Sequence, residues 1–348
     1  MPEPLVRWEG RTMGSPYVIQ IVGGGLTDRR IEQIQVGVAQ RLREINALMS
    51  NYEAGSELSR FNHAAANTPF KVGPDFARVI RFSLELSRQS NGAFDPTLGA
   101  LINLWGFGEA PTTQAPPAAE ALAAARALTG WNHLQLHDEN ELTKDLPGLM
   151  LNLGAVAKGF AVDELVRLLG ANGLTNVYVS IAGEVFAAGH NAHGTSWRVG
   201  ISAPTDYWRE NDPMASVASI SGQALSTSGD YQKFFRDADG HRYSHLLDPR
   251  TGRPVENPLA GVTVVGPDSM NADALGTTLF VLGLEEGMKL IEKQEAAAAL
   301  FIIREGEGRF RTLGSSAWDR LTGKATPARS VTPAATVPER AKAPAAGR

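Results

Sequence analysis

Helical and strand-like patterns alternate along most of this chain, and the alternation restricts the fold more than any other feature. The first helical pattern follows Thr27 and Asp28, which suit a helix N-cap and a first turn. Further helices are expected at about residues 74–91, 117–129 and 156–169, each followed by a glycine that suits a helix C-cap. In the first pattern, large apolar residues recur every three or four positions, as on the buried face of an amphipathic helix: Ile31, Ile34, Val38, Leu42, Ile45 and Leu48.

Short runs rich in β-branched and apolar residues predict strands between these helices. A further strand is expected at 149–153, passing through Gly154 into the helix at 156–169. The mixture favours an α/β or α+β protein over a helix bundle or a β-sandwich. The segment 110–119, rich in Ala, Pro and Thr, is expected to be a surface loop or a connection between lobes. The other expected strands lie at 17–22, 177–181, 197–201, 217–220, 262–265 and 300–304.

Length and composition set outer limits. At roughly 150 residues per domain, 348 residues allow about two domains, although large single domains also reach this length. A formal net charge of −4 does not indicate a nucleic-acid-binding protein. The chain has no cysteine, which excludes disulfides, thiolate catalysis, Cys-ligated zinc and iron–sulfur clusters. Any metal site must therefore use oxygen or imidazole ligands.

The two ends carry their own expectations. The first residues lack the basic start, apolar stretch and cleavage site of a signal peptide. No apolar run approaches the roughly 20 residues of a transmembrane helix. We therefore expect a cytoplasmic protein as written, or a periplasmic one if the chain is a trimmed mature form. Residues 325–348 are mostly Ala, Pro, Thr and Arg, which predicts a disordered tail after a folded domain at 1–324.

Two clusters rich in glycine and polar residues lie in the first half of the chain. In the segment 92–99, Asp95 precedes Pro96, and the simplest interpretation is an Asx-type turn. In the segment 151–159, an expected helix N-terminus and Lys158 could bind a phosphate. The standard nucleotide-binding motifs are absent there, and a tight turn with a solvated lysine is the alternative.

Two more clusters lie in the second half. His245 is the best candidate for a general base, because its intrinsic pKa lies near neutrality, although a structural histidine is the alternative. Asp273 and Thr277 are four residues apart on an expected helix at 271–283, so their oxygens project from one face. A carboxylate and a hydroxyl so placed could hold Mg²⁺ together with substrate phosphates. Such pairs also arise by chance, but the apolar continuation of the helix makes an unpartnered buried Asp273 costly.

In their order along the chain, these clusters resemble one family, the ApbE family of FAD:protein FMN transferases. The resemblance covers about residues 13–315. It rests on Met13-Gly-Ser15, Met49-Ser-Asn-Tyr52 with Ser56-Glu-Leu-Ser-Arg-Phe-Asn62, Gly92-Ala-Phe-Asp-Pro-Thr97, Leu104-Trp-Gly-Phe-Gly108, Leu151-Asn-Leu-Gly-Ala-Val-Ala-Lys-Gly159, Thr227-Ser-Gly-Asp-Tyr231, His245-Leu-Leu-Asp-Pro-Arg-Thr-Gly252 and Ala272-Asp-Ala-Leu-Gly-Thr277.

The resemblance implies an α+β fold, ApbE-like and T-fold-like, with mixed sheets, packed helices and two intimately associated lobes that hold FAD between them. It also implies a Mg²⁺-dependent reaction in which FMN moves from FAD to a threonine, or sometimes serine, hydroxyl of an acceptor flavoprotein subunit, with release of AMP. His245 would deprotonate that hydroxyl, and Asp273, Thr277 and the main-chain oxygen of Ala155 would bind Mg²⁺. The implied FAD contacts are Met13, Tyr52, Ala93, Phe94, Asp95, Asn152, Lys158 and Leu247.

This chain departs from the family pattern at Asn152, whereas the lysine at position 158 is common in the family although some members carry an acidic residue there. Many relatives carry aspartate at the position of Asn152, whose amide donates as well as accepts hydrogen bonds but brings no charge. Two other functions remain open: a Mg²⁺-dependent FAD pyrophosphatase that uses water as the acceptor, and a non-catalytic flavin-binding module, which would not need the metal pair or the base.

Overall fold

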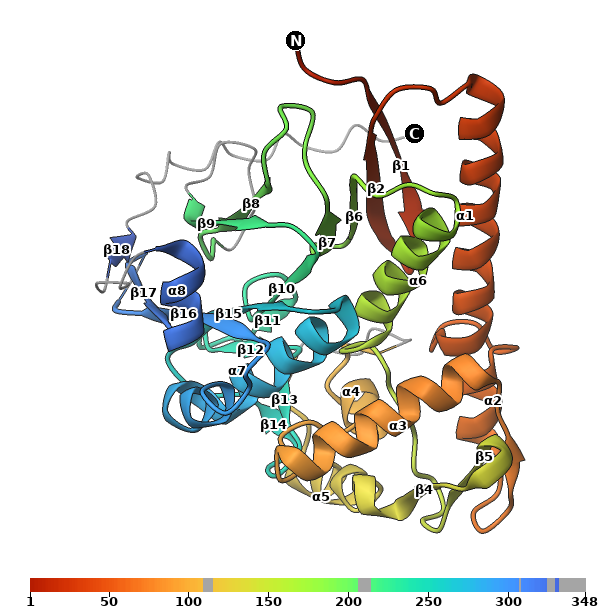
Figure 1. Ribbon diagram of the computed structural model, residues 1–348. Coiled ribbons are helices and arrows are strands. Elements are labelled where there is room, and N and C mark those ends of the chain that lie inside the picture. The colour runs from red at the N-terminus through yellow and green to blue at the C-terminus, as the bar shows by residue number, and fades with distance from the viewer. Residues whose placement is uncertain (109–114, 206–213, 307, 324–328, 332–348) are drawn as a thin grey trace, which may run out of the picture.

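The computed structural model describes the chain except for residues 109–114, 206–213, 307, 324–328 and 332–348 (Figure 1). Part of the expected loop at 110–119 therefore lies outside the described residues. The same is true of the expected tail at 325–348, apart from the short strand β18 (Arg329–Val331). In the described part of the chain, no helix is both long and apolar enough to cross a membrane.

The largest element of the fold is a nine-stranded sheet, in which every neighbouring pair is antiparallel. Its order is β1 (Leu5–Thr12), β2 (Ser15–Val22), β6 (Val177–Ile181), β7 (Glu184–Ala188), β10 (Gln223–Gly229), β15 (Leu259–Gly266), β16 (Ala298–Arg304), β17 (Phe310–Gly314) and β18. The smaller sheets pair β8 (Trp197–Ser202) with β9 (Met214–Ile220), β5 (Glu141–Lys144) with β3 (Phe70–Lys71) and β4 (Leu134–Leu136), β11 (Phe234–Arg236) with β12 (Arg242–Ser244), and β13 (Leu247–Asp248) with β14 (Arg253–Pro254). The pairs in the smaller sheets are antiparallel too, so the expectation of mixed sheets is wrong for the described residues.

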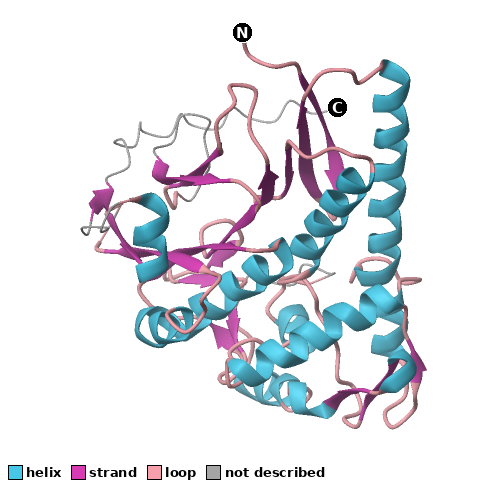
Figure 2. Cartoon of the chain, in the orientation of Figure 1, coloured by secondary structure: helices cyan, strands magenta, loops and turns pink. Residues whose placement is uncertain are grey.

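The expected helices are present. Thr27 caps the first helix as predicted, since its hydroxyl oxygen accepts a hydrogen bond from the Arg30 N–H at 3.3 Å. Figure 2 shows the long helices α1, α6 and α7 together on one side of the nine-stranded sheet. The helices are α1 (Asp28–Met49), α2 (Glu57–His63), α3 (Pro74–Gln89), α4 (Gly99–Leu104), α5 (Ala119–Arg126), α6 (Ala157–Ala171), α7 (Ser269–Ile291) and α8 (Ser316–Thr322).

Both faces of the central sheet are buried at strands β15 and β16, and β16 shows how one strand contributes to two cores. Successive side chains of a strand point to opposite faces. Ala299, Phe301 and Ile303 pack into the core under α1, α6 and α7. The alternate residues, such as Leu300 and Ile302, pack into a second core beneath the β8–β9 pair and α8. Residues 298–303 of this strand are therefore all apolar, which explains why the sequence predicted a strand there.

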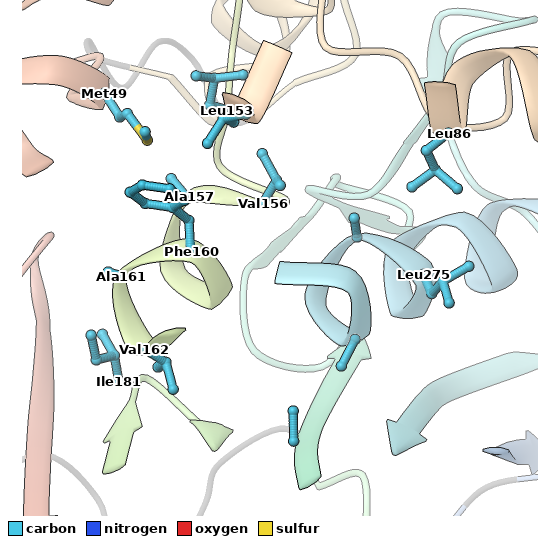
Figure 3. Close-up of a cluster of buried hydrophobic side chains, with 14 of the residues drawn as sticks. Met49, Leu86, Leu153, Val156, Ala157, Phe160, Ala161, Val162, Ile181 and Leu275 are labelled. Carbon is cyan, nitrogen blue, oxygen red and sulfur yellow. The ribbon is translucent and has the colours of Figure 1, made fainter. Parts of the chain in front are cut away.

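The first core surrounds the N-terminal half of α6 (Figure 3). Phe160 is fully buried there, close to Met49 of α1, Leu153 in the segment before α6 and Ile181 of β6. Burial of one such aromatic side chain contributes about 1.5–3 kcal/mol. This core joins elements from distant parts of the sequence around the start of α6.

The prediction of a strand at 149–153 is wrong. Apart from an isolated bridge between Leu98 and Met150, this segment is irregular. The side-chain amide of Asn62 takes the place of a neighbouring strand at Leu151: its oxygen accepts from the Leu151 N–H at 2.7 Å, and its nitrogen donates to the Leu151 carbonyl at 3.0 Å. Asn51 donates to the same carbonyl at 3.2 Å. Apolar content alone could not reveal this arrangement.

The predicted end of the next helix is also wrong. α6 continues through Gly170 to Ala171, and the left-handed residue after it is Gly173, with φ 77°. Gly170 is an ordinary helical residue. The other two predicted stops, Gly92 and Gly130, do take positive φ values of 77° and 139°.

Candidate active site

A cavity of about 450 Å³ opens where the core around α6 meets a smaller apolar cluster that contains Leu98, Phe107 and Leu247. Segments between Met13 and Val281 form its wall. Every residue that the sequence predicts for the site lines this one cavity: Met13, Tyr52, Ala93, Phe94, Asp95, Asn152, Ala155, Lys158, His245, Leu247, Asp273 and Thr277.

Lys158, in the first turn of α6, lies between two carboxylates. Its ammonium is 2.5 Å from Glu184 Oε1 and 3.8 Å from Asp273 Oδ1. Burial alone would lower the pKa of Lys158, but the charges of Asp273 and Glu184 more than offset this effect, and the pKa is raised. The lysine is therefore charged at neutral pH, rather than a solvated residue of a simple turn.

Asp273 is almost fully buried on α7. Its Oδ2 accepts a hydrogen bond from the Gly159 N–H at 3.0 Å. Burial and the charge of Glu184 raise the pKa of Asp273 above its ordinary value, although Lys158 and the bond from Gly159 lower it. Thr277 lies one turn further along α7, and its hydroxyl is 3.1 Å from the hydroxyl of Ser228. The predicted pair therefore shares one face of the helix and borders the cavity.

The oxygen donors at this position suit a hard cation. Among the described residues, no group of three or more His, Asp or Glu side chains could hold a metal by itself. Mg²⁺ does not need such a cage, since it is often bound through one or two carboxylates, water and substrate phosphates. A buried carboxylate with a hydroxyl one turn away, on the wall of an open cavity, fits that mode of binding.

Glu184 is a site residue that the sequence analysis missed. It begins β7 after a tight turn in which Ala182 and Gly183 take φ values of 55° and 99°. Its side chain is 5% exposed, pairs with Lys158 through one oxygen and accepts a hydrogen bond from the Ser226 hydroxyl through the other. The sequence did offer one signal for this residue: Glu184 follows Gly183, which lies two residues after the end of the expected strand at 177–181.

His245 lines the same cavity, and one ring nitrogen is already engaged. Because a carbonyl can only accept, the 3.0 Å contact between His245 Nδ1 and the main-chain oxygen of Lys233 places the ring proton on Nδ1. Burial, together with the positive charges of Lys233 and Lys158, lowers the pKa of His245 to about 4 although the bond to Lys233 raises it. The imidazole is neutral at pH 7, and Nε2 can accept a proton.

Lys233 was also missed. Its ammonium donates to the Phe107 carbonyl at 2.7 Å, and the lysine lines the cavity beside His245. No sequence motif pairs it with the histidine twelve positions later. Only the hairpin of β11 and β12 brings the two residues together.

The residues expected to contact the flavin differ in exposure. Tyr52 is 69% exposed, so its ring is free to stack against a ligand. Ala93 and Phe94 are buried in the wall.

The Asp95 carboxylate accepts from the Thr97 N–H at 2.8 Å, the Thr97 hydroxyl at 2.6 Å and the Trp131 N–H at 3.0 Å. The bonds from Thr97 form the predicted Asx-type turn, and burial raises the pKa of Asp95 in spite of all three bonds.

Asn152, where the chain differs from many relatives, also caps a turn. Its side-chain oxygen accepts from the Gly154 N–H at 2.9 Å, and its own N–H donates to the Pro96 carbonyl at 2.8 Å. The amide therefore shapes the turn that leads to Ala155 and α6. An aspartate could accept the same bond from Gly154, so the turn itself does not require the amide.

A model of the ApbE family matches residues 13–301. The chain belongs to the ApbE family. Relatives described as FAD:protein FMN transferase include one from Klebsiella pneumoniae, 38% identical over 87% of this chain and 85% of the relative. Another, from Haemophilus influenzae, is 36% identical over 91% of this chain and 92% of the relative.

Solved ApbE structures have the same fold. The flavin transferase ApbE from Vibrio cholerae has a TM-score of 0.83 and 37% identity, covering 92% of this chain and all of its own. The apo form of the flavinyl transferase ApbE from Pseudomonas stutzeri has a TM-score of 0.82 and 37% identity, covering 93% of this chain and 98% of its own. This similarity confirms a mixed α+β ApbE-like fold.

Proposed function

We propose that this chain is an FAD:protein FMN transferase that uses Mg²⁺ to move FMN from FAD to a threonine or serine hydroxyl of an acceptor flavoprotein, releasing AMP. The observation that carries the proposal is the single cavity in which a neutral histidine, a half-buried lysine and a carboxylate–hydroxyl pair come together. The names of the relatives support the same reaction.

The transfer needs a base for the nucleophile. His245 Nε2 takes the proton from the acceptor hydroxyl, whose oxygen then forms a bond to the phosphorus on the FMN side of the diphosphate. The bond from that phosphorus to the bridging oxygen breaks, and AMP leaves with the bonding electrons. General-base assistance of this kind contributes about 10²–10⁴-fold. The Lys233 carbonyl keeps the ring proton on Nδ1 and so leaves Nε2 available.

The diphosphate also needs positive charge. Mg²⁺ bound by Asp273, Thr277 and the main-chain oxygen of Ala155 would neutralise negative charge that develops on the phosphate oxygens. Lys158 provides a second positive charge in the same part of the cavity. Its two carboxylate partners fix the ammonium before the substrate binds, so little reorganisation accompanies the reaction.

We further propose that the folded part of the chain consists of two associated lobes, T-fold-like, with FAD between them. One lobe would be the sheet with α1, α6 and α7. The other would be built on the cluster of Leu98, Leu101, Trp105, Phe107 and Leu247. Met13, Tyr52, Ala93 and Phe94 line the same cavity as Leu98, Phe107 and Leu247 of this cluster.

The function can be tested with a flavoprotein domain that carries a target threonine. After incubation with FAD and Mg²⁺, mass spectrometry of the acceptor should show one added FMN, and the His245→Gln variant should give far less adduct. A second acceptor whose threonine is replaced by valine serves as the control. Release of free FMN without adduct would instead identify an FAD pyrophosphatase, and unchanged FAD would identify a non-catalytic flavin-binding module.

A further inference from the structure

At the N-terminal end of each of the helices α6 and α7, main-chain N–H groups donate hydrogen bonds to an aspartate of the other helix. The carboxylate of Asp163, on α6, accepts from the Ser269 N–H at 2.7 Å and the Met270 N–H at 2.9 Å, the first two residues of α7. In return, Asp273 of α7 accepts from the Gly159 N–H in the first turn of α6. First-turn N–H groups have no partner within their own helix, so these bonds satisfy groups that would otherwise be unpaired.

The backbones of the two helices also touch. A Cβ on Gly159 would lie 2.2 Å from the Ser269 carbonyl oxygen and 2.8 Å from the Met270 Cα, both of them backbone atoms that cannot rotate away. Glycine is therefore required for this approach. The contact and the exchanged aspartates together fix the start of α7 against the first turns of α6.

A third aspartate shows what is specific to Asp163. Asp268 is the N-cap of α7, and its side chain accepts from the Asn271 N–H at 2.8 Å within the same helix end. Both aspartates place negative charge at the positive end of α7, which is stabilising for either one. Of these two aspartates, Asp163 is the one whose bonds also connect α7 to α6.

The connection bears directly on the site. Asp273 follows Ser269 by one helical turn, and Ala155 and Lys158 lie at the beginning of α6. We propose that Asp163 is a positioning residue: by holding α7 to α6, it sets the separation between the Asp273–Thr277 pair and the Ala155 turn, and hence the affinity for Mg²⁺. This inference rests on the proposed function, which assigns Mg²⁺ to those three residues.

The test compares Asp163→Asn with Asp268→Asn. Both variants remove one negative charge from the same helix end, but the Asp163 amide retains only one acceptor oxygen for its two donors. Calorimetric titration of the FAD-saturated full chain with Mg²⁺ should show weaker binding by about 10–100-fold for Asp163→Asn, as for other groups that orient metal ligands. Asp268→Asn should keep the wild-type affinity. Saturating Mg²⁺ should restore FAD turnover in Asp163→Asn at a temperature at which the variant is already folded without Mg²⁺, because ligand binding would also rescue an unfolded variant.

A second pair of variants, Gly159→Ala and its control Gly170→Ala, tests the packing of the helices without changing any charge. Gly159→Ala should weaken Mg²⁺ binding because the methyl group forces the helices apart. Gly170→Ala, at a position of α6 with open space around it, should not. Thermal unfolding in parallel establishes that each variant is folded.

The outcomes separate the two proposals. If the wild type binds Mg²⁺ and Asp163→Asn binds it equally well, the positioning role is overturned while the proposed function stands. Equal weakening by Asp268→Asn would also overturn it, because the effect would then belong to helix-end charge. A wild type that binds no Mg²⁺ would overturn both the metal assignment and the positioning role.

Discussion

His245 donates its Nδ1 proton to the main-chain oxygen of Lys233, whose own side chain lowers the pKa of that histidine. One lysine thus acts on the imidazole in two ways, through its backbone and through its charge. The first action sets the tautomer and the second disfavours the protonated ring. A side-chain substitution at position 233 removes only the second.

The pH dependence of the transfer should reflect this charge. A histidine with a pKa of about 4 loses its function as a base only when the pH falls through about 4. In Lys233→Met the positive charge is gone, so the pKa of His245 should rise towards its ordinary value and the acid limb of kcat/KM should move to higher pH. An unmoved limb would show that burial alone sets this pKa or that another group titrates.

The same pKa has a consequence for stability. The ordinary pKa of about 6.5 applies to His245 in the unfolded chain, so between that pH and about 4 the unfolded state binds the additional proton. The stability contributed through the neutral histidine should therefore be present above pH 6.5 and be lost as the pH falls towards 4. Urea unfolding of the wild type and His245→Gln at several pH values should show a difference that changes in this window.

Asp273→Asn should impair FAD turnover more than any substitution of a flavin contact. The metal supplies several kcal/mol of transition-state stabilisation, so a loss of about 100-fold or more in kcat is expected. Tyr52→Ala should mainly weaken FAD binding, since stacking on an aromatic ring is worth about 1–3 kcal/mol. Fluorescence titration of FAD and steady-state kinetics on both variants distinguish the two effects.

Glu184→Gln tests the ion pair that the sequence did not reveal. Removal of one partner of a buried pair can cost about 3–5 kcal/mol, and here Asp273 remains near Lys158, so a smaller loss of unfolding free energy is expected. A double-mutant cycle with Lys158→Met measures the interaction. If the two single effects simply add, the contact makes no net contribution to stability.

Asn62→Ala should destabilise the fold and loosen the cavity wall together. The change leaves the buried Leu151 N–H without its partner, which costs about 1–3 kcal/mol, while Asn51 still donates to the Leu151 carbonyl. FAD binding should weaken because Asn152 is the next residue. Asn191→Ala, which removes bonds from an exposed turn, is the control for urea unfolding and should have a small effect.

The sequence predicted the elements whose pattern depends on local periodicity. The amphipathic face of α1 and the apolar run of β16 could be recognised because their buried positions are occupied by apolar residues at regular spacing. The sequence analysis missed strands β1 and β10. Charged and apolar residues alternate in β1, and β10 is rich in hydroxyl side chains. The segment at 149–153 was misassigned because its backbone partners are side-chain amides from a distant loop and helix.

The site was predictable only where residues carry a family pattern. His245, Asp273 and Lys158 follow from the resemblance, and the structure places all of them on one cavity. Glu184 and Lys233 act through partners 26 and 12 positions away, which no local pattern specifies. Long-range pairing of this kind becomes visible only when the strands are in place.

The bond from Gly159 to Asp273 also decides where α6 can begin. If the helix started one turn earlier, the Gly159 N–H would donate to the Ala155 carbonyl, four residues before it. That N–H donates to Asp273 instead, and α6 begins at Ala157. A single carboxylate on one helix therefore limits the length of another, and keeps the Ala155 carbonyl out of the regular hydrogen-bond ladder at the position where the proposed metal would need it.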